Sequence, residues 1–313
     1  MSYWQSASSD LDDRLAELSK LFLACRDAFH ETADTYQWIP APGSPAANDA
    51  DALPSPDPGI VEPRGETGHR LIAEVAQIFL LTATGHLGGL ASLYASNDII
   101  FSSALLLRAV IENCAHALWV LGDDPDEPAE NRLARAYLED LYSAEEAKKN
   151  AGRMRGKTHE SHVHAEQAYT TLKSQILARY PEATRQSLGE GTLLNQKIPG
   201  LEAAVKWMYS LTEAAGGTIT QEQASGIYGY LSNMTHPTLY PVRQHRGWYD
   251  DSEKGSMVAY LRVDLGSVED EARAAIAAFY NAMTYTTSYF GWPAKVMDRL
   301  EAKIAAAIPK FFR

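Results

Sequence analysis

Two separated segments of the chain carry polar side chains at one-turn spacing within apolar surroundings. The first, from Ile99 to Leu121, holds Arg108, Glu112 and His116 at positions i, i+4 and i+8. On a helix these side chains form one polar stripe, because residues four apart lie on the same face. An unpaired buried charge is costly, so the guanidinium and the carboxylate must meet partners from elsewhere in the chain.

The second segment carries Tyr228, Ser232 and His236 on one helical face, and Pro237 follows directly. A residue before proline avoids helical geometry, so the His236 imidazole is expected at the carboxyl end of the helix. The helix dipole there favours the protonated form of a histidine. Such an imidazole can act as an acid, a base or a charged anchor, or it simply caps the helix.

Together the two stripes predict a polar site inside the protein, in which Arg108, Glu112, Ser232 and His236 converge as catalytic residues. In a nuclease, Arg108 would stabilise phosphate charge and His236 would exchange a proton. A nucleophilic triad built on Ser232 lacks the strand–turn–helix elbow that such a serine needs. The structural alternative is an Arg108–Glu112 pair that only fixes the register of a helical bundle. Substrate contacts are expected from neighbouring side chains, namely Tyr228, Asn233, Tyr240, Arg243 and His245.

A divalent transition metal is the rival enzymatic interpretation, and without it no cofactor is expected. Glu112 and His116 have the spacing that places a carboxylate and an imidazole on one ion. His236 would complete the site, with Glu74 or Glu139 as further options. No HExxH sequence supports this interpretation.

Two short stretches resemble a known group of proteins. Residues 104–121, ALLLRAVIENCAHALWVL, and 228–237, YGYLSNMTHP, are similar to uncharacterised all-helical bacterial families related to the HEPN superfamily. The resemblance implies a toxin, defence or stress protein that cuts or binds RNA, through an arginine and a histidine one to two helical turns apart. Seven residues separate Arg108 from His116, which exceeds the usual spacing, and the nonpolar Ala109 follows the arginine. Arg153 and His159 have a permitted spacing.

The charge balance limits the partners. A formal net charge of −12 opposes unspecific binding to nucleic acid or to an anionic membrane. Residues 148–164 are the most basic region, and they are either a solvated face or the place where RNA phosphates bind. The region contains Lys148, Lys149, Arg153, Arg155, Lys157, His159, His162 and His164.

The cysteines and the apolar runs indicate a location. Cys25 and Cys114 are the only cysteines, and both lie in apolar helical contexts that suit a reducing compartment. Charged residues such as Arg108 interrupt the apolar runs before they reach the roughly 20 residues that span a bilayer. We therefore expect a cytoplasmic protein without a signal peptide or membrane span. The sequence is compatible with a homodimer. An alternative function is a non-catalytic binding or dimerisation module.

The pattern of apolar residues predicts an all-α protein. Of the 313 residues, 45% are apolar and 22% are charged, which is typical of a soluble globular protein with a substantial core. Helical periodicity predicts a bundle in which 67–94 and 99–121 form a central antiparallel pair. Alternation predicts a short extended or β insertion near 255–264. Two capping boxes, Thr220 with Gln223 and Ser267 with Asp270, predict the starts of two later helices.

The amino-terminal part has a different composition. Seven of the fifteen prolines lie between Pro40 and Pro63. This composition predicts a non-helical linker or strap over 38–64. It separates an N-terminal helix within 1–37 from a main helical body over 65–313.

Overall fold

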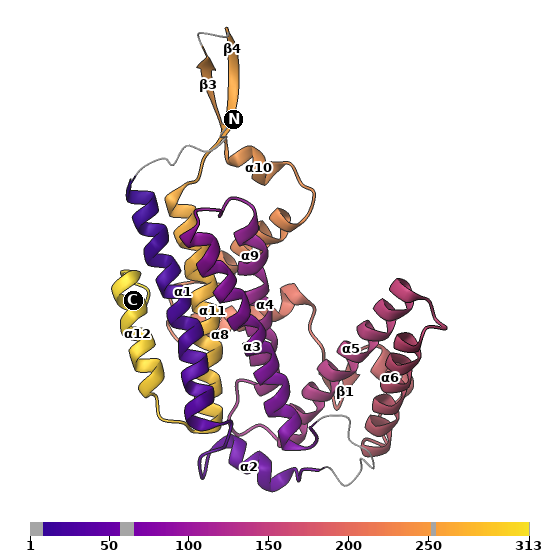
Figure 1. Cartoon of the computed structure of the whole chain (residues 1–313). Helices are drawn as coiled ribbons and strands as arrows, with labels where there is room; N and C mark the ends of the chain where they lie inside the picture. The colour runs from indigo at the N-terminus through magenta and orange to yellow at the C-terminus, as the bar shows by residue number, and fades with distance from the viewer. Residues whose placement is uncertain (1–8, 57–65, 252–254, 313) are drawn as a thin grey trace.

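The computed structural model describes residues 9–56, 66–251 and 255–312. These residues form twelve helices and two small antiparallel sheets, so the predicted all-α bundle with a short strand insertion is confirmed. Figure 1 shows a central group of long helices, a helical pair that leans away from it, and a β-hairpin that projects from one end.

The core lies between four long helices. These are α1 (Ser9–Tyr36), α3 (His69–Ala95), α4 (Ser102–Leu121) and α11 (Leu265–Phe290). Apolar side chains such as Phe22, Leu87, Leu107 and Phe279 are fully buried between them. The long periodic segments therefore form the antiparallel α3–α4 pair that the sequence predicted.

Shorter helices cover this core. They are α8 (Leu201–Ala214), α9 (Gln221–Thr235), α10 (Tyr240–Gln244) and α12 (Lys295–Ala307). Thr220 and Gln223 form the predicted capping box of α9. The second predicted box is wrong, because Asp264 caps α11 by accepting from the backbone N–H of Ser267. In the predicted box the Asp270 side chain would accept from the backbone N–H of Ser267. The Asp264 carboxylate takes that hydrogen bond instead.

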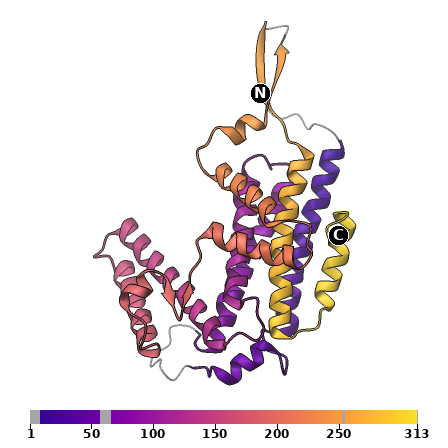
Figure 2. The ribbon, with the colours of Figure 1, turned by 180° about the vertical axis from the view of Figure 1, so that it is seen from behind.

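The leaning pair consists of α5 (Ala129–Arg155) and α6 (Glu160–Arg179), which pack against each other (Figures 1 and 2). A second apolar cluster, including Leu133, Tyr137 and Ile176, lies between this pair and the lower end of α3 and α4. Three small elements continue the chain toward α8: α7 (Arg185–Gly189), β1 (Thr192–Leu193) and β2 (Gln196–Lys197).

The predicted extended insertion is one strand of a hairpin. β4 (Ser256–Leu261) pairs antiparallel with β3 (Arg246–Asp251). The sequence did not predict β3, because Pro241 and Gly247 indicated an irregular loop there. In Figures 1 and 2 the hairpin extends beyond the ends of the helices.

The proline-rich strap contains a helix, contrary to the prediction. α2 (Pro45–Ala52) begins with Pro45 at its first position, where a missing N–H group costs nothing. The Ser44 hydroxyl accepts a hydrogen bond from the N–H of Ala47 and caps the helix. Residues 57–65 of the predicted linker lie outside the described residues.

α2 also carries the most deeply buried ion pair of the strap. The Asp49 carboxylate, 1% exposed, accepts two hydrogen bonds from Arg132 of α5, at 2.7 and 2.8 Å. The hydroxyl of Tyr289 in α11 donates a third, at 2.8 Å. Burial and the Asp49 charge raise the pKa of Tyr289 well above its usual value, so the phenol remains a donor. The part of the strap that forms α2 is therefore anchored to α5 and α11.

Among the described residues, α3 and α4 are long and apolar enough to cross a membrane by length and composition. Within the structure, 44% and 61% of their apolar windows are buried. Core helices of soluble proteins pass the same test, and here both helices line the main core.

Replacing Asp49 by asparagine is expected to lower the free energy of unfolding by about 3–5 kcal/mol, because the buried Arg132 then loses its hydrogen-bonded counterion and retains only Glu127, at 3.9 Å. Urea denaturation measures this loss. Asp51→Asn is the matched control, since Asp51 is exposed on the same helix. Equal effects of the two substitutions would contradict the anchoring role of Asp49.

Candidate functional site

The predicted stripe on α4 is present, and α9 supplies its partners. The Nε atom of Arg108 donates to the Glu112 carboxylate at 2.7 Å, and the same oxygen accepts the Tyr228 hydroxyl at 2.7 Å. A second guanidinium nitrogen of Arg108 donates to the Thr235 hydroxyl at 2.7 Å. These four residues, named here the α4–α9 cluster, join two helices through charge-assisted hydrogen bonds.

The protonation states in this cluster follow from its contacts. Partial burial acts to lower the pKa of Arg108, but the hydrogen bonds and charge of Glu112 outweigh it and leave that pKa raised. Burial, followed by the Glu112 hydrogen bond, raises the pKa of Tyr228 to about 12. At neutral pH the guanidinium is charged and the phenol is a hydrogen-bond donor. The cluster is thus suited to holding two helices together.

Two predicted catalytic residues do not join this cluster. His236 is exposed at the carboxyl end of α9, where it has an extended backbone before Pro237. Ser232 contributes its backbone carbonyl, which accepts from the Thr235 hydroxyl. The expectation that His236 meets Arg108 in a shielded pocket is therefore wrong, and Thr235 takes that place. Pro237 keeps His236 out of helical geometry, as the sequence predicts, and this places the imidazole at the surface.

The predicted substrate-binding residues are divided between different surroundings. Tyr228 belongs to the α4–α9 cluster, whereas the Asn233 amide donates to the Gly229 carbonyl within α9. Tyr240 and Arg243 are exposed on α10. His245 forms a 2.6 Å hydrogen bond with the hydroxyl of Tyr230, through its Nε2 atom.

A cavity of about 560 Å³ lies at the base of the hairpin beside Tyr230 and His245. Glu271 also lines it, and burial together with the nearby Asp270 raises the pKa of this carboxyl to about 7. Burial, with a contribution from Glu271, raises the pKa of Tyr230 to about 12. His245 and Tyr230 therefore belong to a different environment from Arg108.

The metal alternative finds no complete ligand set among the residues that the structure describes. Nδ1 of His116 is 2.6 Å from the carboxylate of Glu139 on α5. The Glu112 carboxylate is occupied by Arg108 and Tyr228, and His236 is at the surface. These three predicted ligands do not converge on one ion.

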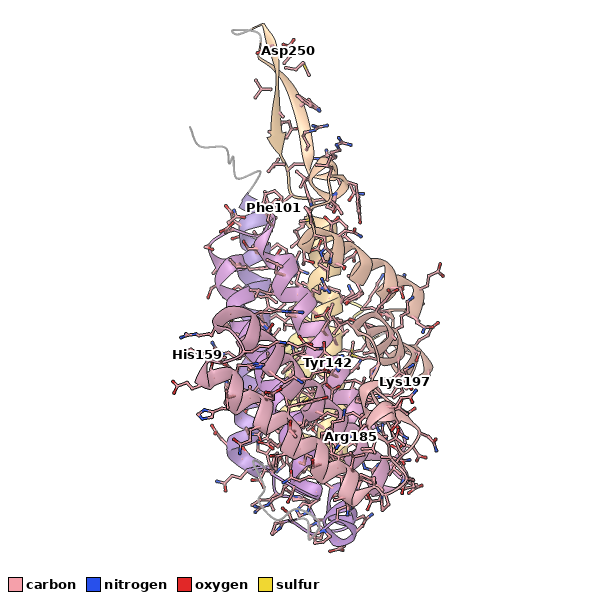
Figure 3. The ribbon with its side chains drawn as sticks, turned by 90° about the vertical axis from the view of Figure 1, so that its right-hand side faces the viewer. Phe101, Tyr142, His159, Arg185, Lys197 and Asp250 are labelled. Atoms are coloured by element: carbon pink, nitrogen blue, oxygen red, sulfur yellow. The ribbon has the colours of Figure 1, made fainter. Side chains whose placement is uncertain are left out.

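Several side chains of the basic region 148–164 already contact other groups of the protein. Lys148 lies 3.8 Å from the ring centroid of Tyr169, and Lys149 forms an ion pair with Glu146. His162 is buried against the Lys148 carbonyl. Arg153 is exposed near the end of α5. Figure 3 shows His159 at this outer end of the leaning pair.

The strongest candidate site is a cavity of about 680 Å³ between α3, α4 and α5, and its lining includes four residues that the sequence offered for a metal, namely Glu74, Glu112, His116 and Glu139. We name it the α3–α5 cavity. Its lining includes His116, which is 8% exposed and contacts the ring of Phe79. Because an ionised carboxylate only accepts, His116 donates to Glu139 through Nδ1. The other nitrogen, Nε2, has no hydrogen-bond partner among the described residues.

A sequence signal for this cavity exists in α5. Glu139 lies between Leu138 and Leu141, which are both buried, so it stands within the apolar part of a helix. A buried carboxylate requires a partner from another element. That partner is His116, but periodicity alone does not indicate which of several histidines meets it.

Comparisons with known proteins add no relative. Scans against protein-family models, curated proteins and solved structures give no match. The site is therefore interpreted from its own geometry.

Arg108→Met and Glu112→Leu are each expected to lower the free energy of unfolding by about 1–3 kcal/mol, because each removes the charged partner of a partly buried group. The double variant should cost less than the sum of the two, by about 1 kcal/mol or more. Chemical denaturation of the four proteins gives this coupling energy. Strictly additive losses would show that Arg108 and Glu112 do not stabilise each other on α4.

Proposed function

We propose that the protein is a binding module that holds an organic cation in the α3–α5 cavity. The cavity would not bind a phosphate. The observation that carries this proposal is the lining. Six carboxylates surround the cavity, and its described lining residues include no lysine or arginine. The carboxylates belong to Glu66, Glu74, Glu112, Glu139, Asp140 and Glu146.

Part of this negative charge has no lysine or arginine paired with it among the described residues. Three carboxylates have a cationic partner outside the lining, as Glu66 with Arg70, Glu112 with Arg108, and Glu146 with Lys149. Glu74 instead accepts a backbone hydrogen bond at 3.2 Å, and Glu139 faces an imidazole. Within the described chain, no lysine or arginine forms an ion pair with either. A cavity with one sign of charge concentrates ligands of the opposite sign and repels phosphate.

The remaining lining favours a ligand with an apolar body. Ile78 is 52% exposed and Tyr142 is 54% exposed, and both line the cavity together with Phe79. Aromatic faces attract cations as well as alkyl groups. The volume is in the range of small-molecule sites, which combine apolar walls with a few polar groups. An ammonium group near Glu74 or Glu139, with its alkyl chain along α3, satisfies both features.

His116 adds a hydrogen-bonding group to this site. A neutral imidazole that donates through Nδ1 has a lone pair at Nε2 and can accept an N–H group there. A buried polar atom without a partner costs about 1–3 kcal/mol, so an N–H donor that reached Nε2 would recover part of this energy. Protonated amines, amidines and guanidines offer such donors.

Hexylammonium is expected to bind wild-type protein in isothermal titration calorimetry, whereas hexanoate, of similar length and opposite charge, is not. Glu74→Gln and Glu139→Gln should each weaken binding about tenfold, which corresponds to about 1.4 kcal/mol. The affinity should also fall with added salt, because the attraction is electrostatic.

Glu182→Gln is the charge-matched control, since Glu182 is exposed and lies outside the cavity lining. Thermal unfolding shows whether Glu139→Gln still folds, and Glu74→Gln provides a second test at a less buried position. Equal binding of hexanoate, no binding of hexylammonium, or equal weakening by Glu182→Gln would each contradict the proposed cation site.

The ribonuclease hypothesis from the sequence is a separate proposal. It assigns proton transfer to His236, so His236→Ala should abolish cleavage of total RNA by the purified protein. Arg108 already donates to Glu112 and Thr235, which leaves fewer of its N–H groups for a phosphate. Identical RNA patterns with wild type and His236→Ala, resolved by denaturing gel electrophoresis, would exclude this role of the histidine.

A further inference from the structure

The β3–β4 hairpin has unused hydrogen-bonding capacity. The two strands pair only with each other, and in the described chain no backbone hydrogen bond joins the outer edge of β3 to another strand. Figure 3 shows Asp250 near the far end of the hairpin, well beyond the helices. A hairpin of two strands is marginally stable in water, and a free edge pairs readily with another strand.

One face of this hairpin is both apolar and exposed. In β3, Arg246, Trp248 and Asp250 alternate along the strand and share this face. Their cross-strand partners in β4 are Leu261, Ala259 and Met257, respectively. Trp248 is 51% exposed and Met257 is 58% exposed. The Arg246 guanidinium lies 4.7 Å from the centroid of the Trp248 ring.

The charges on this face of β3 complement those on the same face of a second copy. When β3 lies antiparallel to a second β3 with the two Trp248 residues opposite each other, Arg246 of one copy falls opposite Asp250 of the second. The two-fold relation repeats this contact on the other side. A register shifted by one residue would move the exposed side chains to opposite faces and lose these pairs. Pairing through β4 would bring no charged residue opposite another, since Ser256–Leu261 contains none.

We propose that β3 is the interface of a two-fold homodimer, in which the hairpins of two copies form one four-stranded antiparallel sheet. The occupant of the free edge is a second copy of this chain, selected by the Arg246–Asp250 contacts and by two adjacent tryptophans. Pairing the edges satisfies the free backbone groups, and the apolar face gains cross-strand contacts. This proposal is independent of the proposed cation site.

Charge reversal tests the register of this interface. Arg246→Asp places two carboxylates opposite each other twice in the dimer, and Asp250→Arg places two guanidinium groups there. Each single variant should raise the dimer dissociation constant more than about tenfold, because opposed like charges are unfavourable. Sedimentation equilibrium of the full chain over a concentration series measures this constant.

Restoring the complementarity distinguishes a specific contact from damage to the hairpin. The double variant Arg246→Asp/Asp250→Arg should dimerise again, and an equimolar mixture of the two single variants should form heterodimers. Arg243→Asp is the control, since Arg243 is exposed on α10 and lies outside β3. It should leave the dissociation constant unchanged.

Three results would overturn the proposal. In the first, the wild-type chain stays monomeric over the whole concentration series. In the second, neither single charge reversal weakens the dimer. In the third, the single variants are monomeric and the double variant is monomeric as well. The first result would leave the free edge for a strand of a different protein.

Discussion

The bidentate ion pair between Asp49 and Arg132 is the constraint on which the rest of the structure depends. Both side chains are buried, at 1% and 3% exposure, and they are tolerated there because each neutralises the other. The pair joins α2 to the first turns of α5, and Tyr289 adds the end of α11. It thereby fixes the point where α5 leaves the central bundle. Glu139, two turns further along α5, consequently meets His116 of α4 in the lining of the cavity.

The polar stripe of α4 serves two different environments. Arg108 and Glu112 are hydrogen-bonded to α9 and to each other, although Glu112 also lines the α3–α5 cavity. One turn beyond Glu112, His116 lines a cavity and has one nitrogen without a partner among the described residues. A satisfied ion pair stabilises an interface between helices, whereas an unsatisfied buried nitrogen next to an open space favours a ligand. The stripe thus changes its role along a single helix.

The two ends of the molecule also differ in how they treat apolar side chains. Near α2, aromatic residues such as Phe290 and Trp292 stack with their ring centroids 4.4 Å apart and are buried. At the opposite end, the hairpin carries Trp248 and Met257 largely in solvent (Figure 1). Apolar exposure on this scale is uncommon unless another surface covers it. These exposed side chains support the interface that the free edge of β3 and the positions of Arg246 and Asp250 indicate.

Apolar periodicity predicted the long helices, because a side-chain pattern repeated over 20 or so residues leaves only one face to bury. It also predicted that Arg108 and Glu112 need partners, and the desolvation of charge is a local cost that any buried helix incurs. The identity of the partners was a tertiary outcome. Thr235 instead of His236 meets Arg108, and His116 meets Glu139, because the crossing of helices and the position of α5 set these distances. Local sequence determines which groups must be satisfied, whereas packing between residues of different helices, 23 positions apart for His116 and Glu139 and 127 for Arg108 and Thr235, decides which group satisfies them.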